Sequence, residues 1–225
     1  MIISICQPHF LPWIGYFIML KRCDKFIYLD DVNYNRRSWQ NRCHILNPNL
    51  ESGKQLISLS IKSPSRDKKI NETLVKTESI ERIIRQIHNI YRKAKFFKLY
   101  FKDIEKILID SAEDNLSKIN INLINYFSEV LEIKTKKNLS SSFLKKYKKE
   151  NLILEILQRY NAKTYLANEG SLNYAGDSFF KKHNINFEVN RFIHPKYNQI
   201  KNLFIPNLSI IDLIFFNGED SKNYL

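Results

Sequence analysis

The sequence predicts an α/β protein with a Rossmann-like, mostly parallel sheet and a helical insertion or subdomain. Two observations lead to this fold class. Short apolar runs of strand type alternate with helical patterns near both ends of the chain, whereas the middle of the chain shows helical patterns in succession without strands between them. We therefore expect a single α/β domain over residues 1–225, with a mainly helical insertion at residues 72–132.

The first elements are a strand, a helix and a second strand. Residues 2–6 form an apolar run, which ends at Gln7-Pro8 because proline has no N–H to give to a sheet. After Pro12, apolar side chains recur at helical spacing, and proline suits the first turn of a helix. A second strand at residues 26–29 follows. This order is typical of the start of a parallel α/β sheet.

The middle of the chain continues with one more strand and then with helices. The strand is expected at residues 56–61, and a polar tract at residues 62–71 follows it. Apolar residues then form three stripes at three- and four-residue steps, so we expect helices throughout residues 77–131. These helices are interpreted as scaffold, and the region they form is a candidate lid over a crevice.

The last third of the chain returns to α/β alternation. We expect, in order, a strand at residues 133–136, a helix around 152–160, a strand at 164–166, a helix near 178–182 and a strand at 186–190. The final helix is expected to begin at Ser209, a favourable N-cap residue. Asp212 lies in its first turn, where the helix dipole favours a carboxylate, and is interpreted as a capping residue.

Candidate functional residues follow the first two strands. In open α/β sheets, ligands bind in the crevice at the carboxyl ends of the strands. Gln7 and His9 follow the first strand, and Asp30 and Asp31 follow the second, so we expect all four in that crevice. As an adjacent pair in an extended chain, the two aspartates would point to opposite sides, which makes a poor metal site.

The segment from Arg36 to Arg42 is dense in hydrogen-bond donors. Guanidinium groups bind phosphate and carboxylate in a two-pronged manner, so Arg37 and Arg42 are expected to hold a diphosphate or a carboxylate. Trp39 or Trp13 would stack on a base or a sugar, and Asn41 joins them as a binding residue. The alternative is an exposed loop whose arginines pair with the two aspartates described above.

Two later segments add candidates. The expected strand at residues 164–166 leads into a glycine-bearing loop and a helix, which favours an anion near Asn168 and Ser171. His194 precedes a proline and is held extended, and an imidazole titrates near neutral pH. His9 or His194 is therefore the expected general base, and Tyr197 is a further binding residue.

Several motifs, in one order, resemble the WbqC-like family of bacterial proteins, often encoded among O-antigen and other surface-polysaccharide genes. At the N-terminal end they are Gln7-Pro8, Leu11 to Phe17, Asp30-Asp31-Val32 and Trp39 to Arg42. At the C-terminal end they are His194-Pro195, Tyr197, Gln199, Phe204 to Leu213 and Asn217-Gly218. The resemblance implies modification of a sugar, such as N-acylation or aminoacylation of an amino sugar. Asn168-Glu169 departs from the family's loop, which is rich in glycine and serine.

The helix after the first strand is also similar in position to the His-x-Gly-His element of HIGH-superfamily nucleotidyltransferases. Gly15 lies where a glycine lets a ligand approach the helix backbone. Trp13 and Tyr16 stand where that superfamily has its two histidines. We therefore expect these three residues to contact substrate, but not to transfer an adenylyl group by that mechanism.

Composition narrows the class of protein and of partner. Lys and Arg exceed Asp and Glu by 36 − 23 = 13, which points to an anionic partner such as a nucleotide sugar, an acyl carrier protein or an aminoacyl-tRNA. The alternative is a compositional bias of the whole chain. Three cysteines without a CxxC pair indicate free thiols, and we expect no metal and no cofactor. No apolar run is long enough for a membrane span, so the expected location is the cytoplasm.

These observations lead to one functional hypothesis and two alternatives. The hypothesis is a transferase of surface-polysaccharide biosynthesis that acylates or aminoacylates a nucleotide-linked amino sugar. In this scheme Asp30 or Asp31 orients the sugar hydroxyl or the amine. The alternatives are a noncatalytic module that binds a sugar nucleotide or a carrier, and a transferase that draws its aminoacyl group from a charged tRNA.

Overall fold

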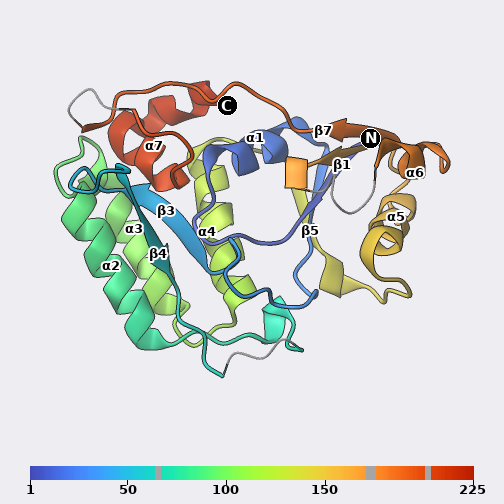
Figure 1. Ribbon diagram of the computed structural model, residues 1–225, viewed down its shortest axis with the longest axis horizontal. Coiled ribbons are helices and arrows are strands. Elements are labelled where there is room, and N and C mark those ends of the chain that lie inside the picture. The colour runs from blue at the N-terminus through green and yellow to red at the C-terminus, as the bar shows by residue number, and fades with distance from the viewer. Residues whose placement is uncertain (64–66, 171–175, 201–203) are drawn as a thin grey trace. The chain divides into compact units, whose positions relative to one another are not determined.

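The computed structural model describes residues 1–63, 67–170, 176–200 and 204–225 (Figure 1). Tertiary contacts divide the chain into two compact units. The sheet unit consists of Met1–Gln7, Gly15–Asp31 and Ile133–Ile193. The helical unit consists of Pro8–Ile14, Val32–Glu132 and His194–Leu225. The chain thus leaves the sheet unit three times, directly after the first strand, again after Asp30-Asp31 and finally after Ile193.

The sheet unit contains a five-stranded sheet in the order β5-β2-β1-β6-β7. Its strands are β1 (Ile2–Cys6), β2 (Lys25–Tyr28), β5 (Lys136–Leu139), β6 (Thr164–Ala167) and β7 (Asn186–Val189). All four pairings between them are parallel. Numbered within this sheet alone, the strand order is 3-2-1-4-5, the order of Rossmann folds, with the switch point between β1 and β6. The predicted fold class is confirmed.

Burial explains why these short segments form the sheet. In a parallel sheet covered on both faces, strands read as continuous apolar runs, and every residue of β6 is buried. The helices of this unit are α1 (Ile14–Arg22), α5 (Lys149–Arg159) and α6 (Asp177–Lys181), with the 3₁₀ turn η2 (Ser140–Ser142). The ring centroids of Tyr165 on β6 and Phe180 on α6 lie 5.1 Å apart.

One strand lies later than the sequence pattern indicates. A strand was expected at residues 133–136, but β5 begins at Lys136, which pairs with Lys25 of β2. The preceding residues connect the helix α4 (Leu116–Val130) to the sheet, and the Thr135 hydroxyl donates to the carbonyl oxygen of Leu20, 2.7 Å away. The apolar residue in this stretch, Ile133, is buried in that connection, so its apolar character marked burial rather than strand pairing.

The helical unit contains three long helices, α2 (Thr77–Tyr91), α3 (Phe97–Asp110) and α4 (Leu116–Val130). They fall within the helical region expected at residues 77–131, and most residues of the three apolar stripes are buried. The unit also contains η1 (Ile70–Glu72), α7 (Ile210–Asn217) and the 3₁₀ segment η5 (Gly218–Tyr224). No helix in the described ranges is both long and apolar enough to cross a membrane.

An antiparallel hairpin was not expected. β3 (Arg42–Leu46) pairs with β4 (Lys54–Ser58), and the two lie side by side in Figure 1. β4 also starts two residues before the strand expected at 56–61. The short β3 escaped notice because its sequence, Arg-Cys-His-Ile-Leu, follows directly on the polar Arg36 to Arg42 segment.

Gly218, which ends α7, has a backbone conformation that other residues adopt only with strain. Its φ is +59°, and a β-carbon placed there would lie 2.7 Å from the ring of Phe96. We expect Gly218→Ala to lower the free energy of unfolding by about 3 kcal/mol, from the left-handed backbone and the steric overlap together. Chemical denaturation would measure the loss. Gly176→Ala is the control, since nothing lies within 4 Å of a β-carbon there, and an equal loss in both variants would contradict this account.

Candidate functional site

The carboxyl edge of the parallel sheet holds two of the predicted residues, on neighbouring strands at the switch point. Gln7 follows β1 and Asn168 follows β6. The Asn168 Nδ2 donates to Cys6 Sγ, 3.2 Å away. Burial raises the pKa of Cys6 to about 12 even though this hydrogen bond opposes the shift, so the thiol stays protonated at neutral pH. Ser171 lies outside the described residues.

Asp30 and Asp31, which follow β2, form hydrogen bonds with the residues of η2. Asp30 is buried and accepts hydrogen bonds from the Ser141 backbone N–H at 3.0 Å and from the Ser141 hydroxyl at 2.6 Å. Asp31 accepts from the Ser140 hydroxyl and from Lys145 Nζ. Burial alone would raise the pKa of Asp31, but the bonds from Lys145 and Ser140 outweigh it and hold that pKa below its ordinary value. Within the sheet unit, the partner of Asp31 is thus Lys145.

The Asp31–Lys145 pair is expected to contribute to stability, because only 11% and 12% of the two side chains are exposed. Asp31→Ala should lower the free energy of unfolding by about 2 kcal/mol, since breaking a largely buried pair leaves one charge without its partner. A double-mutant cycle with Lys145→Met measures the coupling. The Asp31 contribution to stability should be lost as the pH falls below about 4, because its folded-state pKa lies below its unfolded value. A coupling near zero would contradict a stabilising pair.

Gly15 and Tyr16 are both buried inside the sheet unit. The Gly15 carbonyl oxygen accepts from Asn190 Nδ2 at 3.0 Å. The Tyr16 hydroxyl donates to the Gln7 carbonyl oxygen at 3.2 Å, and its side chain is only 1% exposed. In this structure the two residues connect α1 to the end of β1 and to Asn190. Their predicted contact with substrate stays a prediction.

The helical unit contains a cleft of about 360 Å³, here called the aromatic cleft. This volume falls in the range of small-molecule sites, roughly 300 to 1,000 Å³. Two half-exposed indoles, Trp13 and Trp39, stand in its wall beside two imidazoles and two cations. It is lined by residues 9–13, Trp39, residues 42–44, Lys54, Asn207 and Ser209. Aromatic faces and cations together suit an anionic ligand with a planar or sugar moiety.

Both imidazoles of the aromatic cleft are neutral at physiological pH. Burial lowers the pKa of His9 to about 4. The pKa of His44 is also lowered, by burial first and then by the positive charges of Lys54 and Arg42. The His44 ring lies edge-on to Trp39, 5.4 Å between ring centroids. A neutral imidazole can accept a proton from a bound substrate.

His194, the second predicted base, has both ring nitrogens engaged. Its Nδ1 lies 2.9 Å from the Pro195 carbonyl oxygen, and its Nε2 accepts from the Asn207 backbone N–H at 3.2 Å. The ring also stacks on Trp13, 6.4 Å between centroids. These contacts hold the imidazole in one orientation and support one wall of the aromatic cleft.

Two loops that carry cleft residues are joined by the buried Asn120 of α4. Its Nδ2 donates to the carbonyl oxygens of Pro8, at 2.9 Å, and Gln40, at 2.7 Å. The Phe10 backbone N–H donates to the Trp39 carbonyl oxygen at 2.9 Å. Since Pro8 precedes His9 and Gln40 lies between Trp39 and Arg42, these bonds fix the spacing of the residues that line the cleft.

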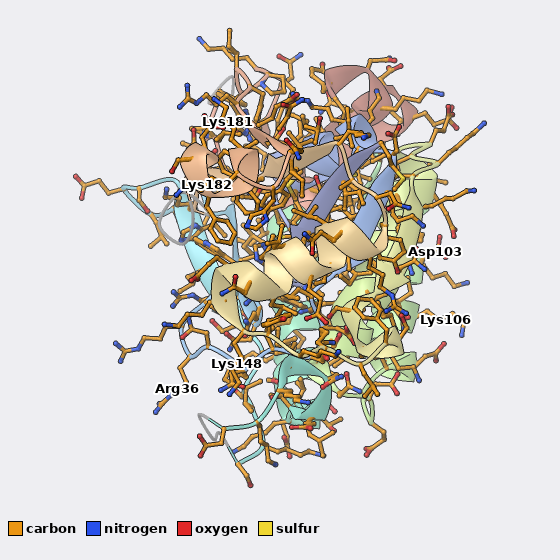
Figure 2. All side chains as sticks on the ribbon, turned by 90° about the vertical axis from the view of Figure 1, so that its right-hand side faces the viewer. Arg36, Asp103, Lys106, Lys148, Lys181 and Lys182 are labelled. Carbon is orange, nitrogen blue, oxygen red and sulfur yellow. The ribbon has the colours of Figure 1, made fainter. Side chains whose placement is uncertain are left out.

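A second hollow of about 230 Å³, the arginine pocket, is lined by Tyr34, Arg36, Arg37, Asn41, Arg42 and residues 58–61. Arg42 also lines the aromatic cleft. Its guanidinium donates to the Arg37 carbonyl oxygen and lies over the Trp39 ring, 5.7 Å from the centroid. Arg37, whose carbonyl oxygen accepts this bond, has a φ of +59°. Figure 2 shows the Arg36 side chain extending away from the ribbon.

Tyr197 belongs to a buried cluster around Asp212. The Asp212 carboxylate accepts hydrogen bonds from the Tyr91 hydroxyl at 2.9 Å, the Tyr197 hydroxyl at 2.9 Å and Gln199 Nε2 at 2.7 Å. Burial raises the pKa of Asp212 to about 6 against the effect of these three donors. Ser209 is confirmed as the N-cap, but the interpretation of Asp212 as a capping residue is wrong. Its side chain is fully buried and binds Tyr91 of α2 and two residues of the segment before α7, Tyr197 and Gln199.

Sequence reasoning missed His44, Lys54 and Asn120. His44 and Lys54 belong to the β3–β4 hairpin, and the alternation of polar Arg42 and His44 with apolar Cys43 was the available signal. Asn120 offered none, because a polar residue within a helical stripe reads as part of the exposed face. Across the described residues, no group of three or more His, Cys, Asp or Glu side chains is placed to hold a metal ion.

Comparisons with known proteins agree with the motifs at both ends of the chain. The chain is 28% identical over 228 residues to the uncharacterized protein Rv1507c of Mycobacterium tuberculosis, an alignment that covers 99% of this chain and 96% of that protein. No solved structure matches the chain. The profile of the WbqC-like protein family matches residues 7–224, which takes in the aromatic cleft, the arginine pocket and the Asp212 cluster. The chain therefore belongs to the WbqC-like protein family.

Proposed function

We propose that this protein transfers an acyl or aminoacyl group to the amine of a nucleotide-linked amino sugar, in surface-polysaccharide biosynthesis. The observation that carries the proposal is the aromatic cleft, which combines two half-exposed indoles with neutral imidazoles and two cations. Indole faces bind the apolar side of a sugar ring or a base, and cations bind its phosphates. The neutral imidazoles supply a proton acceptor beside the bound sugar.

His44 is the base in this proposal. The sugar amine nitrogen forms a bond to the acyl carbon, the bond from that carbon to the carrier's sulfur or oxygen breaks, and His44 accepts the amine proton. A general base works best with a pKa near the working pH. The pKa of His9 has fallen to about 4, too low for efficient proton transfer, so His9 is assigned to hydrogen bonding with the acceptor. His194 is assigned to positioning Trp13.

Binding and transfer are tested separately. A thermal-shift panel of nucleoside-diphosphate amino sugars, nucleotides and acyl donors is run on the wild type and on Arg42→Ala, because a ligand of the native state raises the unfolding temperature. We expect a shift with an amino-sugar nucleotide that is lost in the variant. Mass spectrometry then follows product with acyl-CoA, acyl carrier protein thioesters and aminoacyl-tRNA as donors. Binding without product from any donor would favour the noncatalytic module.

A further inference from the structure

The arginine pocket has the chemistry of an anion site distinct from the aromatic cleft. Three arginines line it, Arg36, Arg37 and Arg42. None of its described lining residues is Asp or Glu, and within the described part of the helical unit no carboxylate is within ion-pair distance of these three arginines. Clustered like charges without a counterion repel each other, and a bound anion would relieve that repulsion.

Two buried polar atoms, one on each of two residues that line this pocket, have no hydrogen-bond partner among the described residues. They are the donor Nε of Arg42 and the acceptor Oδ1 of Asn41. A buried polar atom without a partner costs about 1 to 3 kcal/mol, so native structures seldom leave one. The rest of the Arg42 guanidinium is held by the Arg37 carbonyl and the Trp39 ring. A phosphate oxygen would satisfy Nε, and a ligand hydroxyl would satisfy Asn41 Oδ1.

The size of the pocket limits the ligand. At about 230 Å³ it is smaller than the roughly 300 Å³ at which sites for whole small molecules begin. It therefore suits one or two phosphate groups, rather than a complete nucleotide. The remainder of the ligand must lie outside, and the aromatic cleft adjoins the pocket at Arg42.

We infer that the arginine pocket binds the diphosphate of the substrate, and that Arg42 lies where the diphosphate meets the sugar held in the aromatic cleft. This inference rests on the proposed function for the identity of the sugar, but not for the diphosphate. This arrangement explains why Arg42 lines both the arginine pocket and the aromatic cleft. It also predicts selection of a diphosphate-linked acceptor over the corresponding free amino sugar.

Calorimetric titration with pyrophosphate and with UDP tests the inference without any transfer reaction. We expect both probes to bind the wild type and to bind Arg36→Gln/Arg37→Gln at least tenfold more weakly. Both arginines are exposed, so the double variant keeps its packing. Arg85→Gln/Arg92→Gln, which removes the same charge from exposed positions on and next to α2, is the control and should bind within twofold of the wild type.

The outcomes separate this inference from the proposed function. Pyrophosphate that does not bind the wild type, or binds the pocket double variant as well as the wild type, overturns the inference. An equal loss in the control variant also overturns it, because net charge would then account for binding. Probe binding that depends on Arg36 and Arg37, with no product in the transfer assay, supports the diphosphate site and rejects the transferase. Product formation that the double variant leaves unchanged supports the transferase and rejects the diphosphate site.

Discussion

Replacement of His44 by glutamine is expected to lower kcat for the proposed acyl transfer by about 10²- to 10⁴-fold, the usual contribution of a general base. Glutamine keeps the approximate length and the hydrogen-bonding capacity of the imidazole but cannot accept the amine proton. Substrate affinity should change by only a few fold, because the indole faces and Arg42 remain. Steady-state kinetics of product formation, with binding measured separately by calorimetry, distinguish the two effects.

The pH profile gives His44 a signature that a purely structural role would not produce. A general base acts in its unprotonated form, so the rate should fall as the pH drops through the His44 pKa. Burial, Lys54 and Arg42 lower that pKa from the ordinary value of 6.5. The acid limb of the wild type should therefore lie below pH 6.5, and Lys54→Met should move it upward, toward the ordinary value. A profile that Lys54→Met leaves unchanged would contradict this assignment.

Matched histidine variants show whether the loss belongs to His44. His88→Gln, on the exposed side of α2, should leave kcat unchanged. His194→Gln should weaken binding through Trp13, with a smaller effect on kcat. Full turnover by His44→Gln would remove it from the mechanism, and a large loss confined to His9→Gln would move the base to His9.

Local patterns in the sequence predicted the parallel sheet well. Proline at position 8 and the aspartates at 30 and 31 mark where β1 and β2 end, and apolar runs mark buried strands. The three helical stripes likewise predicted α2, α3 and α4, because a buried helix face repeats every three or four residues. Such signals depend only on neighbours in the chain.

The grouping of the candidate residues depends on contacts between distant segments. His9 belongs to the helical unit and Asp30 to the sheet unit, and their common crevice stays a prediction. The β3–β4 hairpin that carries His44 and Lys54 gave no strong periodic signal within its five-residue strands. Asn120 acts through two carbonyl groups more than 70 residues away, as the separations of 80 and 112 residues show. No local pattern encodes such a bond.

Asp212→Ala is expected to lower the free energy of unfolding by about 4 kcal/mol, more than the other substitutions described above. The variant leaves two tyrosine hydroxyls and the Gln199 amide buried without their acceptor, at about 1 to 3 kcal/mol for each unsatisfied group. For a chain of this size the unfolding temperature should fall by roughly 10 °C. Asp220→Ala, at an exposed carboxylate on η5, is the control and should change stability by less than about 0.5 kcal/mol.

The raised pKa of Asp212 also predicts an unusual dependence of stability on pH. The folded-state pKa of Asp212 is raised from 3.8 to about 6. A folded state that binds a proton more tightly than the unfolded chain loses stability as the pH rises through that pKa. Between pH 4 and pH 7.5 the wild type should therefore lose up to about 3 kcal/mol relative to Asp212→Asn, whose side chain does not titrate. Urea denaturation of both proteins across this range measures the difference.

The effect of pH on the Asp212 cluster should extend to the aromatic cleft. Hydrogen bonds of Tyr91 connect the cluster to β3, the strand that carries His44. The Tyr91 hydroxyl that donates to Asp212 also accepts from the Leu46 backbone N–H of β3, at 2.9 Å. Tyr91→Phe should remove both bonds and loosen β3, whereas Tyr197→Phe removes a bond to Asp212 alone. We therefore expect Tyr91→Phe to weaken binding in the cleft more than Tyr197→Phe at equal loss of stability. Equal binding losses would mean that the cluster supports the fold without positioning the cleft.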